Sequence, residues 1–371
     1  MSTIQLIGLS GLALGVVNLA VLGLEYSRKN TFDLGQLPLT RAVTWLTRLF
    51  IGVLFIYSGF VKANDYIGFS YKLTEYFEVF SEDFSWFEGF FKFWIPYAEP
   101  LAWFISVFEI ALAFAIILGW QMNLTAWLTL LMMVFFTILT GYSHFTGAVT
   151  DCGCFGDALK IEPWESFSKD LILLVMIAPL FILRKTIKAF PSGAVATAIT
   201  ALSFVIAGAY SYYCYENLPR VDYRPYKVGK DLNICTTQPG PDGLIKCKDW
   251  DEIYRLGEDY SVLEGDVMMM VMYDMEKIDE EALKSTGPFA RDMKSVPGLR
   301  VIGATSTGKS VVEGYVKKYV LEYDFSFRDL TMLKTIIRSN PGYVLMRNGV
   351  ILAKWHHNNQ PDAAEVKALL K

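Results

Sequence analysis

The chain has few of the residues on which metal sites and nucleic-acid binding depend. Its 371 residues include 3 histidines and 5 cysteines, and its formal net charge is −4. Without a basic balance, nothing in the composition indicates a nucleic-acid partner. No spacing of Cys and His makes a convincing zinc site, so we assign no residue as a metal ligand. Five cysteines cannot all pair within one chain, which leaves at least one thiol free, reactive or transiently paired.

The first apolar run also lacks the basic residues that normally precede a signal peptide. Residues 4–24 follow Met-Ser-Thr, and the basic residues come afterwards, at Arg28 and Lys29. A cleaved signal peptide would carry its positive charge before the apolar core. About 20 apolar residues are enough to cross a bilayer. We therefore predict an uncleaved membrane helix.

Apolar residues are abundant and unevenly distributed. The chain is 53% hydrophobic and 15% aromatic, with a mean hydropathy of +0.32, which is too apolar for an ordinary soluble protein. The apolar runs end near Cys214, and the remainder has a soluble composition. We predict an α-helical polytopic membrane bundle followed by an α/β domain. The predicted spans are residues 4–24, 41–61, 101–120, 124–142, 169–183 and 193–213.

The domain organisation follows from these spans. Residues 1–40 hold the first membrane helix and a cytoplasmic loop, residues 41–190 the bundle, residues 191–218 the last membrane helix, and residues 219–371 the soluble domain. The aromatic-rich segment 64–100 is predicted to be an amphipathic helix lying in the membrane interface. Lys62, just before it, is expected to be an interfacial anchor.

Loop charges predict the orientation in the membrane. Basic residues follow the first and fifth spans, at Arg28, Lys29, Arg41, Arg184, Lys185 and Lys188. The segments 64–100 and 143–168 are instead rich in acidic residues. Because Lys and Arg stay in cytoplasmic loops, both termini and the segment 143–168 are predicted to lie outside the cytoplasm. We expect a multi-pass protein of a bacterial inner membrane with its C-terminal domain in the periplasm.

Two ionisable residues lie inside predicted spans: Arg48 in the second and Glu109 near the middle of the third. An ionisable side chain in hydrocarbon costs several kcal/mol unless it is paired or faces a cavity. One interpretation is a structural Arg48–Glu109 pair, or an arginine that reaches the interface. The other is that both residues line a polar cavity used by a cofactor or a proton path.

The segment Thr150–Asp157 contains two closely spaced cysteines and is the main candidate for a functional site. It reads Thr-Asp-Cys-Gly-Cys-Phe-Gly-Asp, so Cys152 and Cys154 flank a single glycine. Three interpretations remain open: a metal site, a disulfide that staples the loop to Cys214 or to another chain, and a reversible dithiol. A bond between cysteines this close would be strained and hence oxidising. His144, about two helical turns earlier, is a candidate to favour the thiolate or carry its proton.

The C-terminal domain shows alternating strand and helix patterns. The predicted order is two βα units, a hairpin around Arg347-Asn348-Gly349 and a final helix, which makes an α/β sandwich. Cys235 and Cys247 bracket a turn-rich loop and are the candidate structural disulfide. The segment Gly303–Ser310 matches a phosphate-binding pattern. We nevertheless predict no nucleotide binding, because no strand ending in a magnesium-binding Asp follows.

This order resembles a thioredoxin-like domain, with Ser339-Asn340-Pro341-Gly342 just before the hairpin. In that family the proline is cis and lies beside the active-site cysteines. The family's C-x-x-C should follow the first long strand, where this chain has Tyr273-Asp-Met-Glu276. The resemblance therefore implies a redox-inactive domain that docks a partner through Asn340 and Pro341. His356 and His357 are expected to be surface residues.

The membrane part resembles the DoxX family over residues 40–190, as a four-helix core to which this chain adds two spans. Arg48–Lys62 resembles the first helix of that family and Glu109–Trp120 the second. The segment 150–156 with Trp164 and Asp170 resembles the related MauE group of methylamine-utilisation proteins. Bacterial DoxX-family proteins with an extra periplasmic domain resemble the whole arrangement.

The resemblance implies a redox role. MauE members are associated with disulfide formation in a periplasmic partner, and DoxX relatives with quinone-coupled oxidation. Carried over, Cys152 and Cys154 would be the redox pair, with Arg48 and Glu109 lining a bundle that holds a quinone. The leading prediction is a membrane thiol–disulfide oxidoreductase that acts on a periplasmic protein client. The alternative is a non-enzymatic membrane scaffold or assembly factor whose C-terminal domain docks a partner.

Overall fold

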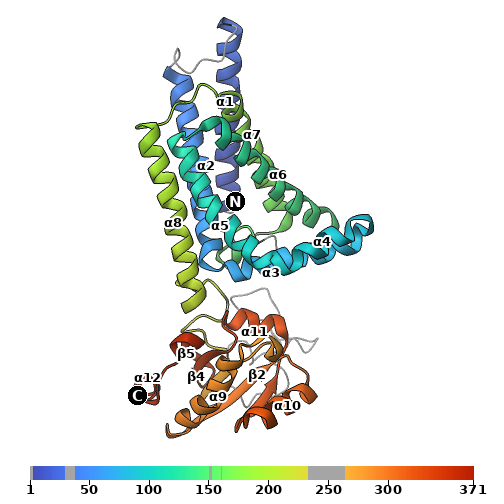
Figure 1. Ribbon diagram of the computed structural model, residues 1–371. Coiled ribbons are helices and arrows are strands. Elements are labelled where there is room, and N and C mark those ends of the chain that lie inside the picture. The colour runs from blue at the N-terminus through green and yellow to red at the C-terminus, as the bar shows by residue number, and fades with distance from the viewer. Residues whose placement is uncertain (1–2, 30–37, 150–152, 160, 233–263) are drawn as a thin grey trace. The chain divides into compact units, whose positions relative to one another are not determined.

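A computed structural model describes residues 3–29, 38–149, 153–159, 161–232 and 264–371. The chain divides into two compact units, Met1–Tyr212 and Tyr213–Lys371. The first unit is helical and the second contains the sheet (Figure 1). Cys152, Cys235 and Cys247 lie outside the described residues.

All six predicted spans are helices. They are α1 Thr3–Lys29, α2 Pro38–Asn64, α5 Ala98–Leu118, α6 Met122–Thr146, α7 Pro163–Ile182 and α8 Gly193–Asn217. Among the described residues, five helical segments are long and apolar enough to cross a membrane. The fifth predicted span, α7, is not one of them, because it carries the charged residues Glu165, Lys169 and Asp170.

Small residues bring α2 and α5 into close contact. A Cβ atom added at Gly52 would lie 2.3 Å from Ile117 Cγ1, and one added at Gly59 would lie 2.7 Å from Ile110 Cγ1. Glycines two turns apart on one helix face let two membrane helices approach closely. As a result, polar side chains on the facing sides of α2 and α5 come within bonding distance.

The segment between α2 and α5 is helical, as predicted, and contains α3 Tyr66–Asp83 and α4 Glu88–Trp94. Figure 1 shows both helices leaving the bundle at a steep angle. One face of α3 is buried against α5 and α6 in an apolar cluster that includes Phe77, Phe80 and Phe136. Several aromatic residues around α4 are exposed among the described residues, with Trp86 at 79%, whereas Phe91 and Trp94 pack against this cluster. This division fits a helix that lies in the membrane interface.

The second unit contains a five-stranded mixed sheet of order β3-β2-β1-β4-β5. Its strands are β1 Asp266–Val271, β2 Leu299–Thr305, β3 Asp324–Phe327, β4 Gly342–Arg347 and β5 Val350–His356. β1 pairs in parallel with β2 and antiparallel with β4. The helices are α9 Glu280–Met293, α10 Lys309–Tyr319, α11 Leu330–Ile336 and α12 Ala363–Leu369. The predicted α/β order is confirmed, while β3 and α11 were not predicted.

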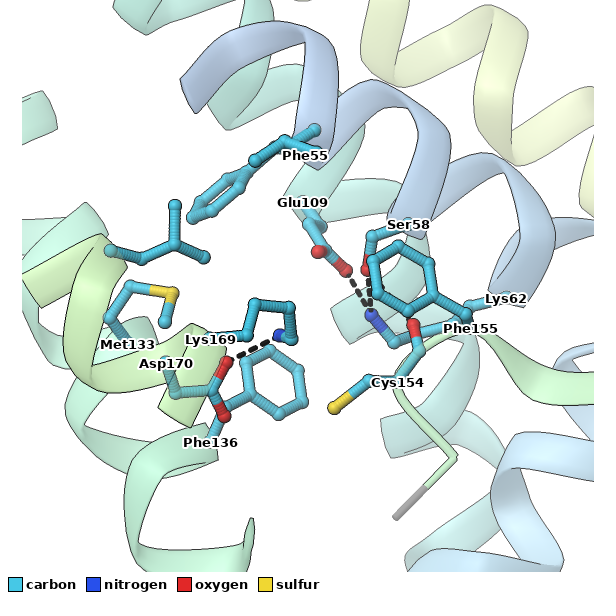
Figure 2. A pocket seen from close by; sticks show the side chains of 12 residues that line it. Phe55, Ser58, Lys62, Glu109, Met133, Phe136, Cys154, Phe155, Lys169 and Asp170 are labelled. Carbon is cyan, nitrogen blue, oxygen red and sulfur yellow. Dashed lines mark hydrogen bonds and ion pairs between the residues drawn. The ribbon is translucent and has the colours of Figure 1, made fainter. Parts of the chain in front are cut away.

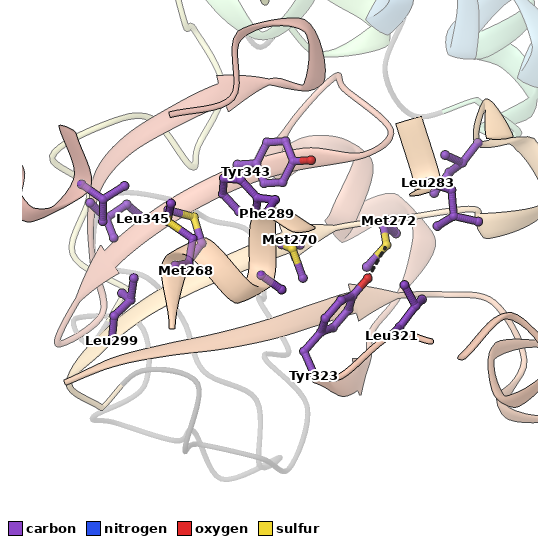
Figure 3. Packing of buried hydrophobic residues seen from close by; sticks show 14 of the residues in the cluster. Met268, Met270, Met272, Leu283, Phe289, Leu299, Leu321, Tyr323, Tyr343 and Leu345 are labelled. Atoms are coloured by element: carbon purple, nitrogen blue, oxygen red, sulfur yellow. Dashed lines mark hydrogen bonds between the residues drawn. The ribbon is translucent and has the colours of Figure 1, made fainter. Parts of the chain in front are cut away.

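Both faces of this sheet are covered. Met268 and Met270 of β1 face a cluster with Phe289 of α9 (Figure 3), whereas Met269 and its alternate neighbours face a cluster with Leu333 of α11. Successive side chains of a strand point to opposite faces. The unbroken apolar run of β1 is therefore the pattern of a strand buried on both sides.

Candidate functional site

The described part of the cysteine loop, residues 153–159, turns tightly against α2 and α3. Gly153 has φ +66° and a Cβ atom there would lie 3.3 Å from Lys72 Cγ of α3. Gly156 has φ +47°, and its amide donates to the Gly153 carbonyl at 3.2 Å. Non-glycine residues rarely adopt such positive φ angles. The two glycines therefore allow the turn that directs Cys154 inward.

Cys154 is buried, with 5% of its surface exposed. Its carbonyl accepts a hydrogen bond from Ser58 Oγ of α2 at 3.0 Å. Figure 2 shows its side chain among those that line a small cavity between α2, α5, α6 and α7. The cavity has a volume of about 20 Å³, which is room for about one water molecule.

Lys62 and Glu109 form a buried ion pair in this cavity. Lys62 Nζ lies 2.6 Å from Glu109 Oε2, with side-chain exposures of 1% and 4%. Lys62 also donates to Ser58 Oγ at 2.7 Å, so the residue that holds the Cys154 carbonyl is itself held by the lysine. The prediction that Lys62 is an interfacial anchor is wrong. The close approach of α2 and α5 places it opposite Glu109 instead.

A second ion pair lies on α7. Lys169 Nζ is 2.5 Å from Asp170 Oδ1, and Thr140 Oγ1 of α6 lies 2.9 Å from Asp170 Oδ2. Asp170 is completely buried. Both residues line the cavity with Cys154. The cavity thus contains two ammonium groups, two carboxylates and one thiol.

Aromatic rings contact both lysine ammonium groups. Lys62 Nζ lies 4.8 Å from the centroid of the Phe136 ring, and Lys169 Nζ lies 5.4 Å from that of Phe155. A cation over an aromatic face is attracted by the ring quadrupole. The loop residue Phe155 therefore carries part of the contact that keeps Cys154 beside Lys169.

The structure does not bring all the predicted site residues together. Glu109 and Cys154 line the same cavity, but Arg48 and His144 do not. His144 is exposed at the end of α6 and stacks on Phe167 at 5.8 Å between ring centroids. His144 therefore lies away from Cys154, while its position relative to Cys152 falls outside the described residues.

Arg48 forms no pair with Glu109. Its Nε donates to the Ile116 carbonyl at 2.8 Å and its Nη2 to the Ile117 carbonyl at 2.5 Å. These carbonyls belong to the last turn of α5. The Ile116 carbonyl also accepts from the Gly119 amide at 3.2 Å, and the arginine adds donors from its side chain. Glu109 precedes Ile116 by two turns, roughly 10 Å along the helix. The arginine therefore caps α5, and the predicted pair is wrong.

A larger cavity of about 420 Å³ lies between α2, α5 and α8. Its walls are apolar apart from Ser203 and Tyr210, and it contains neither a cysteine nor a charged side chain. Tyr210 donates its hydroxyl to Asn64 Oδ1 at 2.9 Å. Ile110 lines this cavity and the adjacent Glu109 lines the other. The α2–α5 pair therefore separates the two cavities.

In the second unit, Asn340 and Pro341 lie at the start of β4 and are joined by a cis peptide bond. Asn340 Nδ2 donates to the Asp274 carbonyl at 2.8 Å. Asp274 belongs to the segment 273–276, where a thioredoxin-like domain would carry its cysteines. On the other side of Asn340, Ser339 Oγ lies 3.0 Å from His357 Nδ1. This cluster lacks thiols at residues 273–276.

Buried polar groups of the second unit have altered acidities. Burial and the neighbouring Arg224 lower the pKa of Lys354 to about 8, although Asp222 at 2.9 Å opposes the shift. Burial and the neighbouring His357 lower the pKa of His356 to about 4. His356 is 6% exposed, so the expectation that it is a surface residue is wrong. Its Nδ1 accepts a hydrogen bond from the Asn358 amide at 3.2 Å.

Comparison with known proteins identifies one part of the chain. Residues 40–184 match the model of the family described as methylamine utilisation protein MauE. The match runs from α2 to α7 and includes every residue that lines the Cys154 cavity. No curated protein and no solved structure matches the chain. With its apolar helices, the chain is a multi-pass membrane protein with a MauE-like core.

Sequence reasoning missed three of the four charged residues of the site. Lys62 and Lys169 stand near the ends of predicted spans, where basic residues usually reach the interface. Asp170 follows Lys169 directly, and in the sequence only the MauE resemblance points to it. The available signal was the number of charges at the entrance of α7, since a helix that places a buried Asp beside a Lys needs partners inside the bundle.

Proposed function

We propose that the chain is a membrane thiol–disulfide exchange protein whose Cys152–Cys154 pair acts on a periplasmic protein client. The observation that carries this proposal is the position of Cys154 in a buried cavity with two lysines and two carboxylates. A cysteine that only staples a loop needs no buried ionisable groups, which are costly in a membrane protein and normally functional.

The exchange divides the work between the two cysteines. Because Cys154 is buried, the client thiolate attacks the sulfur of Cys152, the bond between Cys152 and Cys154 breaks, and Cys154 leaves as a thiolate. A second client thiolate then attacks the client sulfur of the mixed disulfide and releases Cys152. The client loses two electrons and two protons, and the Cys152–Cys154 pair becomes a dithiol. The reverse sequence reduces a client disulfide.

A quinone does not fit beside Cys154. A cavity of about 20 Å³ holds about one water molecule and admits no ring. The cavity of about 420 Å³ is large enough for a ring, but its lining includes no thiol. The residues expected to bind the cofactor, Arg48 and Glu109, are committed to the end of α5 and to Lys62. We therefore derive no step through a quinone.

The C-terminal unit is proposed to recruit the client. Its sheet order supports a thioredoxin-like domain, and residues 273–276 provide no thiols of their own. The surface around Asn340 would then bind the client without exchanging disulfides. We do not assign methylamine utilisation to this chain, because the family match leaves α8 and this unit outside.

The proposal is tested by trapping thiols in cells and identifying disulfides by mass spectrometry. Replacing both cysteines, Cys152→Ser/Cys154→Ser, should leave client proteins in their reduced form. The matched control is Cys214→Ser, which removes a cysteine that does not line the cavity. If client disulfides form equally in the double variant, the exchange mechanism is wrong.

The same experiment distinguishes a scaffold from an exchange protein. The absence of thiols at residues 273–276 favours a scaffold whose C-terminal unit only docks a partner. In that case the Cys152–Cys154 pair would stay fully oxidised under every redox condition. Mixed disulfides with other proteins would instead establish exchange.

A further inference from the structure

The Cys154 cavity contains more hydrogen-bond donors than acceptors. Each lysine ammonium carries three N–H groups. Lys62 uses two of them, on Ser58 and Glu109, and Lys169 uses one, on Asp170. Three of the six N–H groups therefore have no acceptor among the described residues.

The carboxylates offer only one acceptor in return. Lys169 and Thr140 occupy the two oxygens of Asp170. Glu109 Oε2 is bound by Lys62, which leaves Oε1 without a donor among the described residues. Although the formal charges of the two pairs cancel, the spare donors outnumber the spare acceptor. A cavity of this kind favours an anion.

Cys154 can supply that anion. It is the one residue of the cavity lining whose reaction creates a new negative charge, because the other uncharged lining residues are Ser58 and apolar side chains. The Lys169 and Cys154 side chains line the same cavity. Figure 2 shows the side chains of Cys154, Lys62 and Lys169 around this one cavity.

We infer that Lys62 and Lys169 stabilise the thiolate of Cys154 that forms when a client thiol attacks Cys152. This inference rests on the proposed exchange and names the positioning residues of its leaving group. A thiol that is more acidic leaves faster from a disulfide. The two lysines thus make the Cys152–Cys154 bond a better oxidant of clients. When the pair is reduced, the negative charge forms on the Cys154 thiolate, in the cavity that holds the unused N–H groups of the lysines.

Several elements place charged groups near Cys154. The charge of each group decides whether its removal should favour or disfavour the thiolate. α2 supplies Lys62, α5 supplies Glu109, and α7 supplies Lys169 and Asp170. Lys72 of α3 packs against the neighbouring Gly153, and Asp157 follows in the loop itself. α6 contributes Met133 and Phe136, which are uncharged. Removing a lysine should disfavour the thiolate, and removing a carboxylate should favour it.

The test measures how fast Cys154 reacts with a small neutral thiosulfonate as a function of pH. Full-length protein in detergent micelles with Cys152→Ser is the reference, and mass spectrometry follows the modification. Lys169→Met should move the half-maximal rate to higher pH and lower the rate at neutral pH about tenfold, the effect of one pKa unit. Asp170→Asn should move the half-maximal rate to lower pH. Lys169→Arg should restore the reference profile.

Lys92→Met is the matched control, because Lys92 pairs with Glu88 on an exposed helix. Its profile should equal the reference. An unchanged profile in Lys169→Met, or shifts of the same sign in Lys169→Met and Asp170→Asn, would overturn the inference. If Lys169→Met does not fold, Asp170→Asn still decides the sign. Clients that stay oxidised without Cys152 and Cys154 would contradict the proposed exchange while leaving this profile intact, so the two failures are distinguishable.

Discussion

Lys62 Nζ lies 2.6 Å from Glu109 Oε2, and both side chains are almost completely buried between α2 and α5. Ser58 joins the pair to the Cys154 carbonyl through two further hydrogen bonds. The cysteine loop is therefore anchored to a buried charge pair rather than to the membrane surface. This relationship connects the packing of the bundle with the position of the thiol.

Breaking the Lys62–Glu109 pair should destabilise the bundle strongly. Lys62→Met or Glu109→Leu alone leaves one buried charge unpaired, which typically costs about 3–5 kcal/mol. The double variant removes both charges and should recover most of that loss. Chemical unfolding of the full chain in mixed micelles, followed by circular dichroism, measures the three variants.

The corresponding pair on the outside of the protein serves as the reference for this cycle. Lys92 and Glu88 are 59% and 49% exposed, and exposed pairs are screened by solvent. Lys92→Met and Glu88→Leu should not change the unfolding curve measurably. If the loss of unfolding free energy in the double variant equals the sum of the losses in Lys62→Met and Glu109→Leu, the two residues do not stabilise each other, which would contradict the buried pair.

Gly153→Ala should displace the cysteine loop. The φ angle of +66° costs an L-residue about 1–2 kcal/mol, and the added Cβ atom would meet Lys72 Cγ at 3.3 Å. We expect Cys154 to become more accessible, with a faster modification by thiol reagents at neutral pH. Timed alkylation and mass spectrometry of the native protein measure this.

Gly147→Ala separates the two causes. Gly147 has φ +67°, and apart from its chain neighbours no described residue has an atom within 4 Å of an added Cβ. It shares the backbone strain of Gly153 without the contact with α3. Cys154 should stay protected in this variant, and equal accessibility in both variants would mean that the packing of the loop on Lys72 does not matter.

Sequence reasoning located the elements better than it located the charges. The apolar runs of α1, α2, α5, α6 and α8 are long, so length and composition suffice to predict them. The sequence pattern did not predict β3, because Asp-Phe-Ser-Phe is only four residues long and half exposed at the sheet edge. Such a strand has no pattern that distinguishes it from a loop. Its place is set by pairing with β2.

The cavity could be predicted only in part, for a reason of geometry. Glu109 is recognisable because it stands in the middle of an apolar helix. Which cation it meets depends on the crossing of α2 and α5, and Gly52 and Gly59 decide that crossing. Arg48 and Lys62 both lie on the side of α2 that faces α5. The register of the two helices places Lys62 opposite Glu109 and Arg48 opposite the end of α5.

The C-terminal unit should lose stability in mild acid through His356. Its pKa in the folded state is lowered to about 4, below the value of about 6.5 in an unfolded chain. A group whose folded pKa is lowered in this way binds more protons when unfolded. Stability is complete above pH 6.5 and falls towards pH 4, at most about tenfold in the folding equilibrium per pH unit.

Hydrogen-exchange protection factors of the β4 and β5 amides in the full chain measure this loss. Protonation also removes the acceptor that His356 Nδ1 offers to the Asn358 amide. His356→Asn keeps an acceptor at that position and does not titrate, so its protection should lose this pH dependence. The same pH dependence in both proteins would show that another group is responsible.

The central claim is that Cys152 meets the client and Cys154 is the buried partner, and single-cysteine trapping tests it most directly. Cells expressing Cys154→Ser or Cys152→Ser are quenched in acid, alkylated and compared by non-reducing electrophoresis and mass spectrometry. We expect reductant-sensitive complexes with client proteins through Cys152 in Cys154→Ser, and no such complexes in Cys152→Ser. Client complexes through Cys154, or none in either variant, would contradict it.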